Sequence, residues 1–273
     1  MDQDLLIKAR SQLLTNVLDY FVQKDTVLGL FLGGSIPAGI ADAYSDIDLR
    51  VVVTPDSHPQ FVENRLIMPE QWGDFLFNEW RVGTEHCVSH FRPFGKIDVF
   101  YLNLEEFRPS PWYGLPTDVL YDPQGVLADV IGKSRGLPFD MSAEEMNRTI
   151  GKGLAAAHEV YRRIRRGEFF YSQTLLEEFR FYLARIDDLL NDRPPQAIPF
   201  ARLEERVSDS VALAFRQSYG GLERSGLETS LMSLLRAYRR QIVALHDRFS
   251  LLRPIENDLH AVDVILGEWH ERT

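Results

Sequence analysis

Two aspartates separated by one residue are the part of this sequence best suited to chemistry. Asp46 and Asp48 flank Ile47, just before the run Leu49-Arg50-Val51-Val52-Val53, which is typical of a strand. Positions i and i+2 of a strand point to the same face, so the two carboxylates are expected side by side. Such carboxylates repel each other unless a cation lies between them, and Mg²⁺ is a hard cation that suits them. The pattern therefore predicts a magnesium site.

A glycine-serine turn upstream supplies the second half of such a site. An apolar stretch at residues 28–32 predicts a buried strand, and Gly33, Gly34 and Ser35 follow it. We expect a short helix to begin at this turn, before Asp46. Backbone N–H groups at a turn and a helix start bind anions such as phosphate. A phosphate site beside a metal site indicates a site for a metal-bound nucleotide.

A third carboxylate, Asp98, lies in another strand-like run, between Ile97 and Val99. Burying a carboxylate among apolar neighbours is costly unless a cation pairs with it. The alternative for Asp98 is a carboxylate at a strand edge, and for Asp46 and Asp48 it is a turn followed by a surface strand. Because aspartate is disfavoured in strands, the ordered combination of turn, pair and third aspartate favours the metal site.

This combination resembles the active-site signature of the polymerase-β-like nucleotidyltransferase superfamily. Residues 28–102 carry the resemblance, with Gly34-Ser35, the Asp46/Asp48 pair and Asp98 in the order of the signature. Many small members have Gly-Ser-x-Ala-x-Gly. This chain has Pro37 at the fourth position of that motif, where alanine is usual, and proline is tolerated in the first turn of a helix. Beyond residue 102, the layout resembles the two-domain antibiotic nucleotidyltransferases.

The resemblance implies a Mg²⁺-dependent enzyme that transfers a nucleoside monophosphate, expected to be AMP from ATP, to a hydroxyl of a small molecule and releases pyrophosphate. Asp46 and Asp48 would bind two Mg²⁺ ions, about 3.5–4 Å apart. Ser35 and the backbone of Gly34 would bind the β- and γ-phosphates. Asp98 would bind the ion that activates the acceptor, and it is one candidate for the base. An aminoglycoside- or lincosamide-type antibiotic is the best-known acceptor.

Two other functions stay open on the same scaffold. One is transfer of AMP to a protein, as in the antitoxin-type members of the superfamily. Those are short single domains with an arginine where this chain has Ala38. The other is nucleotide binding without catalysis, which the presence of all three aspartates disfavours.

Other residues that could do chemistry also have structural explanations. Glu79 and Glu85 are candidates for a separate base, but each could equally be a solvated surface carboxylate. For the histidines and aromatic residues, we favour hydrogen-bonded or core positions over ligand or stacking roles. No Cys/His spacing indicates zinc. The residues concerned are His86, His90, His158, Trp72, Trp80, Trp112 and Tyr113.

Charge restricts the class of partner. The 273 residues carry a net charge of −10. A protein that binds nucleic acid normally presents a basic stripe, so nucleic acid is disfavoured as a partner. We interpret the arginine-rich runs at residues 162–166 and 236–240 as solvated helix faces. The acidic balance favours a nucleoside triphosphate together with a small acceptor, including a cationic one.

The same sequence predicts a cytoplasmic protein. No apolar run reaches the length of about 20 residues that crosses a bilayer. The acidic N-terminus is not typical of a signal peptide. Cys87 is the single cysteine, which excludes an internal disulfide and fits a reducing compartment. Its apolar neighbours indicate a packed thiol. The oligomeric state is not predicted.

Periodicity predicts an α+β fold in two domains. Residues 1–137 should form a nucleotidyltransferase catalytic domain, a mixed β-sheet with flanking helices. Residues 138–273 should form an antiparallel helical bundle, beginning with a capping box at Ser142 and Glu145. The predicted helices occupy residues 3–22, 58–65, 141–167, 171–191, 200–219 and 223–251, and the predicted strands occupy residues 27–32, 47–54, 85–91, 96–102 and 119–121.

Overall fold

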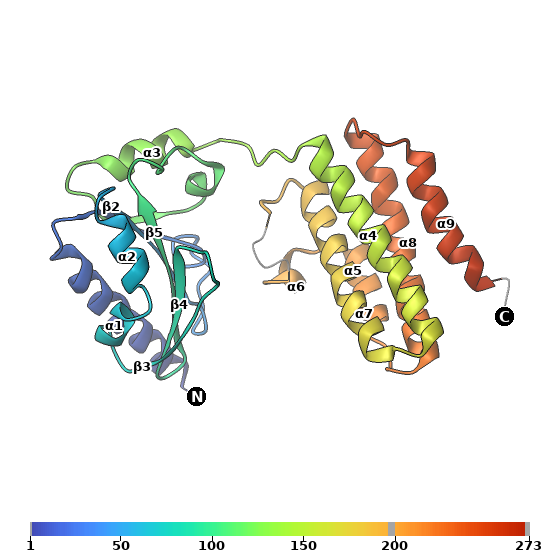
Figure 1. The fold of residues 1–273 in the computed structure, drawn as a ribbon, viewed down its shortest axis with the longest axis horizontal. Helices are drawn as coiled ribbons and strands as arrows, with labels where there is room; N and C mark the ends of the chain where they lie inside the picture. Colours follow the sequence, from blue (N-terminus) through green and yellow to red (C-terminus); the bar gives the residue numbers. More distant parts are fainter. Residues whose placement is uncertain (1, 196–199, 271–273) are drawn as a thin grey trace. The chain divides into compact units, whose positions relative to one another are not determined.

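The computed structural model describes residues 2–195 and 200–270. The chain falls into two compact units, Met1–Pro138 and Phe139–Thr273 (Figure 1). The first unit combines a six-stranded sheet with helices, and the second is built from helices. The predicted α+β fold class is therefore confirmed.

A mixed sheet organises the first unit. Its strands run in the order β3-β4-β5-β2-β1-β6, with β2 and β5 parallel and the other neighbours antiparallel. The sequence pattern predicts every strand except β3, which lies at the edge of the sheet and whose residues stay largely exposed. The strands are β1 (Val27–Gly33), β2 (Ile47–Val53), β3 (Phe75–Glu79), β4 (His86–Phe91), β5 (Gly95–Asn103) and β6 (Asp118–Tyr121).

Helices cover one face of this sheet. Phe21 of the first helix packs in one core with Leu49 of β2 and Val99 of β5. Because strand side chains alternate between faces, Asp48 and Arg50 of β2 point to the opposite face. The covering elements are α1 (Gln3–Val22), α2 (His58–Asn64) and the 3₁₀ turn η1 (Met68–Gln71).

The opposite face is only partly covered. Leu127 packs there with Phe31, Val52 and Phe107 in a smaller core. Asp48 lies on this face beyond that core and stays half-buried. The elements that cover this face are α3 (Val126–Ser134) and the 3₁₀ turn η2 (Pro111–Gly114).

The prediction of a short helix directly after β1 is wrong. Residues 34–39 form successive turns, and no helix occurs between β1 and β2 in the described chain. The Gly39 N–H donates to the Ile36 carbonyl at 3.0 Å, and the Ile40 N–H donates to the Ser35 carbonyl at 3.1 Å. Gly34 and Gly39 both adopt left-handed backbone angles, with φ of +76° and +71°. These two hydrogen bonds span three and five residues, whereas those of an α-helix span four. We call residues 34–39 the Gly-Ser turn.

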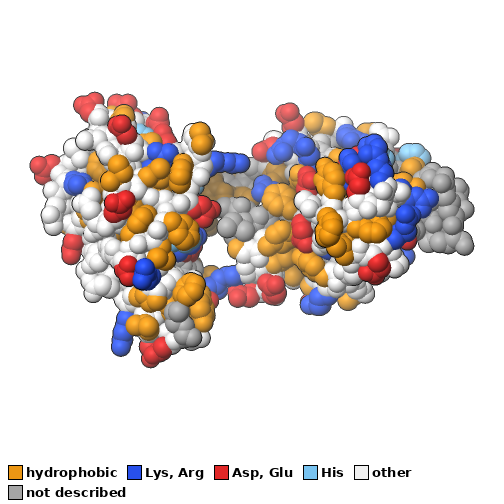
Figure 2. Space-filling model, turned by 60° about the horizontal axis from the view of Figure 1, so that its bottom comes forward, with side chains coloured by type: hydrophobic (Ala, Val, Ile, Leu, Met, Phe, Trp, Pro, Cys, Tyr) orange, Lys and Arg blue, Asp and Glu red, His pale blue; other side chains and the backbone are white. Residues whose placement is uncertain are grey.

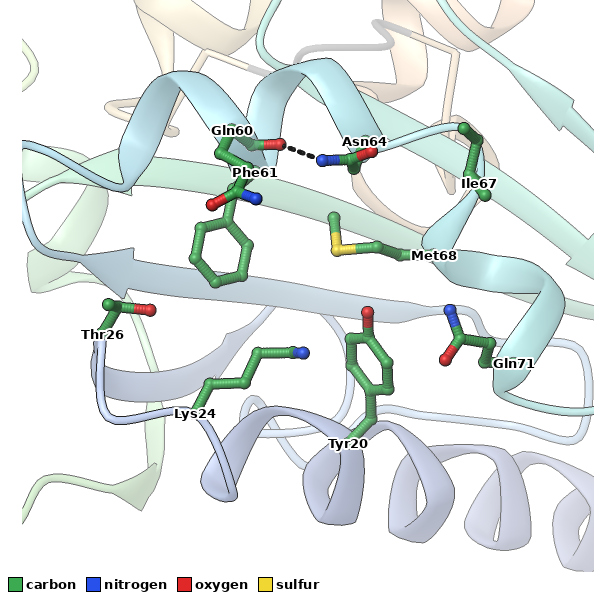
Figure 3. Close-up of a pocket in the computed structure, with 9 residues that line it drawn as sticks. All are labelled: Tyr20, Lys24, Thr26, Gln60, Phe61, Asn64, Ile67, Met68 and Gln71. Atoms are coloured by element: carbon green, nitrogen blue, oxygen red, sulfur yellow. Dashed lines mark hydrogen bonds between the residues drawn. The ribbon is translucent and has the colours of Figure 1, made fainter.

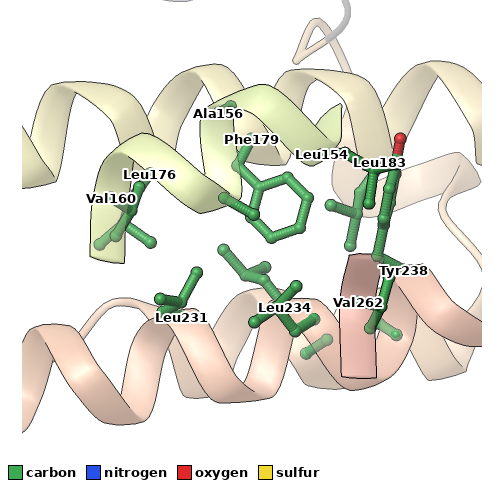
Figure 4. Packing of buried hydrophobic residues seen from close by; sticks show 14 of the residues in the cluster. Leu154, Ala156, Val160, Leu176, Phe179, Leu183, Leu231, Leu234, Tyr238 and Val262 are labelled. Atoms are coloured by element: carbon green, nitrogen blue, oxygen red, sulfur yellow. The ribbon is translucent and has the colours of Figure 1, made fainter. Parts of the chain in front are cut away.

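The second unit is a helical bundle around one apolar core. Val160 of α4, Phe179 of α5 and Leu234 of α8 meet there (Figure 4). The predicted capping box is present, with Ser142 Oγ and the Glu145 side chain bonding each other's backbone. The chain reverses direction between α4 and α5 across two residues, so these helices run antiparallel. The helices are α4 (Ala143–Arg166), α5 (Phe169–Leu190), α6 (Leu203–Arg206), α7 (Asp209–Ser218), α8 (Arg224–Arg248) and α9 (Ile255–His270).

The prediction of a single helix over residues 200–219 is wrong. Two helices occupy this stretch, the first beginning at residue 203 and the second ending at residue 218. The structure breaks it between α6 and α7, where Val207 adopts an extended conformation. The buried Asp187 carboxylate accepts hydrogen bonds from the Ser208 N–H at 3.0 Å and from its hydroxyl at 2.5 Å. A side chain from a neighbouring helix thus replaces the helical hydrogen bond at this point.

Candidate active site

Strand pairing brings two of the predicted carboxylates together. Asp48 of β2 lies directly opposite Gly33 of β1 on one side and Asp98 of β5 on the other. Asp46 comes immediately before β2. Side chains directly opposite each other on neighbouring strands lie on the same face and contact one another. We call Asp46, Asp48 and Asp98 the carboxylate cluster.

A lysine that the sequence interpretation missed links this cluster. Lys96 Nζ lies 2.7 Å from Asp46 Oδ2 and 3.2 Å from Asp98 Oδ1. Lys96 precedes Asp98 by two positions on β5, so the alternation of strand faces was the signal for it. In the described part of the chain, no three His, Cys, Asp or Glu side chains converge as a ready metal site. The ammonium group lies where a cation between two carboxylates is expected.

A second missed cation lies on the other side of the cluster. Arg50 Nη1 lies 3.8 Å from Asp48 Oδ1 and donates to the Asp48 carbonyl at 2.8 Å. The guanidinium also lies over the ring of Phe100, 4.9 Å from its centre. Arg50 follows Asp48 by two positions, so the same alternation places both on one face.

Burial and mutual repulsion shape the ionisation of the cluster. Burial raises the pKa of Asp48, and the charge of Asp46 adds to this, while Arg50 and Lys96 oppose it. Burial likewise raises the pKa of Asp98 against the opposing charge of Lys96. Burial lowers the pKa of Lys96, but its hydrogen bond to Asp46 and the charge of Asp98 outweigh this, so the net change is a rise. The two cations therefore leave the carboxylates incompletely neutralised, and the site favours further positive charge.

The Gly-Ser turn lies against the same cluster. A Cβ at Gly34 would lie 2.0 Å from Asp48 Oδ2, so only glycine leaves room for that carboxylate. Ser35 Oγ is buried and has no hydrogen-bond partner among the described residues. Asp98 Oδ1, although 3.2 Å from Lys96 Nζ, likewise accepts no hydrogen bond from the described residues. Unpartnered buried oxygens beside paired carboxylates fit a hard cation and a polar ligand such as phosphate.

Each of the two glutamates considered as bases lies near a histidine. Glu79 Oε2 lies 3.6 Å from His90 Nε2, and Glu85 Oε2 lies 3.7 Å from His58 Nε2. Both carboxylates are well exposed. These contacts favour the structural interpretation of Glu79 and Glu85.

The remaining histidines and aromatic residues have structural surroundings of several kinds. His86 stacks on Phe100 with ring centres 5.1 Å apart, and His90 stacks on Phe77 at 4.3 Å. Tyr113 packs on Phe107 at 4.9 Å. Trp72 is buried in the core under α1, as expected, but Trp80 and Trp112 are exposed, so the expected core position is wrong for these two residues. His158 is also exposed.

The basic run at residues 162–166 is partly neutralised within its own unit. Arg162 and Arg163 both pair with Glu159, and Arg163 also pairs with Glu168 at 2.8 Å. On the face drawn in Figure 2, basic side chains lie among acidic and hydrophobic ones. This mixture is typical of solvated helix faces. Within the described residues, no helix has the length and apolar character needed to cross a membrane.

Two cavities of the first unit differ in their relation to the cluster. One, of about 350 Å³, lies between α1 and the segment from α2 to η1 (Figure 3). Lys24 and Tyr20 point into it, and it contains none of the three aspartates. The other, of about 630 Å³, is lined by Lys96 and therefore adjoins the cluster.

Solved structures of similar arrangement include two bacterial proteins. For an aminoglycoside 6-adenyltransferase from Bacillus subtilis, the sequence identity is 13%, the match covers 94% of this chain and 97% of that one, and the TM-score is 0.46. For a nucleotidyltransferase-like protein from Exiguobacterium sibiricum, the corresponding values are 14%, 95%, 89% and 0.45. No protein-family model and no curated protein matches the sequence. Both proteins are named as nucleotidyltransferases, the class whose active-site signature this sequence resembles. Because both TM-scores are below 0.5, these matches carry no argument about the activity of this protein.

Proposed function

We propose that this protein transfers a nucleoside monophosphate, AMP from ATP, to a hydroxyl of a small molecule with the help of Mg²⁺, releasing pyrophosphate. The observation that carries the proposal is the carboxylate cluster beside the Gly-Ser turn. Two carboxylates on adjacent strands and a third just before β2 lie beside a turn that has an unpartnered buried hydroxyl. Phosphoryl transfer depends mostly on positioning and on neutralising phosphate charge, and this arrangement supplies groups for both.

The carboxylate cluster would hold one or two Mg²⁺ ions. Bound there, such ions neutralise the triphosphate and polarise the reacting oxygens. Lys96 would leave the space between Asp46 and Asp98 and turn its ammonium toward the substrates.

The turn and Arg50 would hold the leaving group. Ser35 Oγ and the backbone N–H groups of the Gly-Ser turn donate hydrogen bonds to the β- and γ-phosphates. The Arg50 guanidinium, on the same face, adds positive charge for the pyrophosphate that leaves.

Asp98 would take the acceptor proton. Its Oδ1 is buried and accepts no hydrogen bond from the described residues. In the reaction, the acceptor oxygen forms a bond to the α-phosphorus, the bond from that phosphorus to the bridging oxygen breaks, and the hydroxyl proton passes to Asp98.

The test is an acceptor panel read by mass. Purified full-length protein is incubated with Mg²⁺ and ATP or GTP, and with aminoglycosides, lincosamides, sugars and aromatic alcohols. We expect pyrophosphate release that needs one acceptor class, together with a product heavier by one nucleoside monophosphate. Asp48→Asn should lower the rate by about 10²-fold or more, since even residues behind metal ligands contribute about 10–100-fold.

Other outcomes of the same panel distinguish the alternatives. Nucleotide label on the protein itself or on an added protein would support AMP transfer to protein. Nucleotide binding without pyrophosphate release for any compound would support a non-catalytic binding protein. An Asp48→Asn variant with a tenth or more of the normal rate would contradict the role of Asp48.

A further inference from the structure

The cavity beside Lys96 has the size of a small-molecule site. Its volume of about 630 Å³ lies within the range of about 300–1,000 Å³ that is usual for ligand pockets. It lies where the β4–β5 turn meets the loop before β2, and we call it the edge pocket. Its side chains include Tyr44, Leu76, Phe77, His90, Phe94 and Lys96.

The edge pocket and the Gly-Ser turn lie on opposite sides of the carboxylate cluster. The turn follows β1, whereas most of the pocket residues belong to β3, β4 and β5. Asp48 and Asp98, on the two strands in between, separate them. An in-line displacement needs the entering and leaving oxygens on opposite sides of the phosphorus. With the triphosphate at the turn, an acceptor in the edge pocket would approach from the required side.

Lys96 connects the pocket to the cluster directly. It lines the cavity, and its ammonium contacts Asp46 at 2.7 Å and Asp98 at 3.2 Å. A hydroxyl on a molecule in the pocket therefore lies next to the carboxylates once Lys96 moves aside.

Three exposed aromatic side chains give the pocket its chemical character. Tyr44, Phe77 and Phe94 line it although each is well exposed, and exposed apolar groups gathered at one place commonly mark binding sites. Phe77 is held in position by stacking on His90, with ring planes 18° apart. Such rings contact flat, apolar ligands.

The charges that line the pocket disfavour a polycation. Lys96 is basic, His90 is the other titratable nitrogen, and none of the described residues that line it is acidic. Asp46 and Asp98 lie behind Lys96, but in the active complex they would be bound to the metal. A polycationic amino sugar would then meet the Lys96 ammonium with no acidic residue in the wall to pair with it. The residues that line the pocket thus lack the acidic excess that gives the whole chain its net charge of −10.

We infer that the edge pocket holds the acceptor and that this acceptor is neutral or anionic, with its hydroxyl on or beside an apolar or aromatic ring. This inference rests on the proposed function. The hydroxyl oxygen bonds to the α-phosphorus of ATP, pyrophosphate leaves with the electrons of the broken bond, and the proton passes to Asp98.

The first test measures binding without any transfer. We choose 2-naphthol as an uncharged aromatic hydroxyl probe and neamine as a polycationic one. Each is titrated by calorimetry into the full-length protein with Mg²⁺ present, so that the carboxylate cluster is not free to bind the amines. Phe94→Asn removes one ring, and asparagine tolerates the left-handed backbone that Phe94 adopts. Phe170→Asn is the matched control, because both phenylalanines are 81% exposed and Phe170 lies on α5.

We expect 2-naphthol to bind more tightly than neamine. Phe94→Asn should weaken 2-naphthol about three- to tenfold, the usual range for one aromatic contact, and Phe170→Asn should change nothing. Phe77→Ala, on β3 and not in the β4–β5 turn, should weaken it similarly, so the result does not depend on one variant. Tighter binding of neamine, or a dissociation constant that neither pocket variant changes, overturns the inference.

The second test separates this inference from the proposed function. With Mg²⁺ and ATP, Phe94→Asn should raise the KM for an aromatic acceptor and leave kcat nearly unchanged, because the ring contact is the same in ground and transition states. Adenylation of an amino sugar with a KM that Phe94→Asn leaves unchanged overturns the inference while the function stands. Phe94-dependent binding of 2-naphthol without adenylation of any compound supports the pocket as a ligand site, and the proposed function is then what fails.

Discussion

Three carboxylates and two cations lie in contact on one sheet face of this protein. Lys96 touches Asp46 and Asp98, and Arg50 touches Asp48. Burial raises the pKa of Asp48 and of Asp98, although Arg50 and Lys96 oppose this rise. The two cations therefore do not fully offset the cost of burying these carboxylates, and a further cation would reduce that cost. Lys96 is the residue whose removal tests this most directly.

We predict that Lys96→Met destabilises the metal-free protein by about 1–2 kcal/mol, the usual contribution of a partly buried charged hydrogen bond. Asp46 would lose its partner at 2.7 Å, and the carboxylates would repel one another more strongly. Added Mn²⁺ should restore more stability to the variant than to the natural protein, because the cation site is then free. Thermal unfolding with and without Mn²⁺ measures both effects.

The control is Lys133→Met. Lys133 also lies 2.7 Å from an aspartate, Asp129, but both side chains are mostly exposed. Exposed ion pairs contribute about 0–1 kcal/mol, so this variant should change stability little and respond to Mn²⁺ as the natural protein does. Equal behaviour of the two variants would show that the Lys96 contacts have no special role.

At the scale of elements, the Gly-Ser turn positions the cluster. It joins β1 to the loop before β2, and it passes so close to Asp48 that a Cβ at Gly34 would collide with that carboxylate. Gly39 has a similar backbone conformation, but nothing lies within 4 Å of the Cβ position there. A substitution at Gly39 should therefore add backbone strain alone, whereas one at Gly34 should add strain and also displace Asp48.

We predict that Gly34→Ala and Gly39→Ala each destabilise the protein by about 1–2 kcal/mol, the cost of a left-handed conformation for an L-residue. Only Gly34→Ala should also lower the transfer rate, by about 10²-fold, because a shift of about 1 Å at a positioning residue has that effect. Parallel measurement of unfolding and of the rate checks both. If Gly39→Ala loses as much activity as Gly34→Ala, the contact with Asp48 is not the cause.

Packing between α4 and α8 depends on one tyrosine. Tyr238 of α8 is buried and donates to the Ile150 carbonyl of α4 at 2.8 Å. Gly153 makes room for it, since a Cβ there would lie 2.2 Å from the hydroxyl. Burial raises the pKa of Tyr238 well above 10, and the charge of Asp258 adds to this.

The raised pKa of Tyr238 predicts that the free energy of unfolding falls at alkaline pH. Because its folded pKa is raised, the folded state keeps a proton that the unfolded chain loses above a pH of about 10, so stability falls as pH rises beyond that value. Tyr238→Phe should cost about 1 kcal/mol at pH 8 through the lost hydrogen bond. That difference should shrink or reverse at pH 11, as measured by circular dichroism during thermal unfolding. A constant difference at both values would contradict the raised pKa.

At the scale of the whole molecule, two units share one chain. The carboxylate cluster, the Gly-Ser turn and the edge pocket all belong to Met1–Pro138. A ligand of these groups should therefore stabilise the first unit. Trp72, Trp80 and Trp112 belong to it, and Trp269 is the only tryptophan of the sequence beyond Pro138, so tryptophan fluorescence reports mainly on the first unit.

We predict that Mg²⁺ with a non-hydrolysable ATP analogue raises the Tm seen by tryptophan fluorescence by about 5–10 °C. A ligand at 100 times its Kd adds about 2.7 kcal/mol, and each kcal/mol shifts the Tm of a unit this size by about 2–4 °C or more. Mg²⁺ alone should do much less, because paired carboxylates without phosphate bind it weakly. The same shift from the analogue with Mg²⁺ and with a chelator would count against the carboxylate cluster as a metal site.

Much of the architecture was predictable from local sequence patterns. Residues 47–53 alternate in a way that indicates a strand with Asp48 on one face, and the long helices follow from apolar spacing and the Ser142 capping box. These features depend on neighbours in the sequence, where the side-chain periods of 2 and 3.6 act directly. Local patterns also pointed to the Gly-Ser turn and the three aspartates as one candidate site.

Only the tertiary structure decided which of these groups meet and what lies between them. The parallel pairing of β2 with β5 sets Asp48 opposite Asp98, and it places Lys96 beside Asp46. The break before α7 depends on Asp187 of another helix, and the edge pocket combines three strands with a loop and α1. Contacts between segments far apart in the sequence arise from register and packing, which no local period encodes. That is why the aspartates could be named from the sequence, while the contact of Lys96 with Asp46 and the pocket beside it could not.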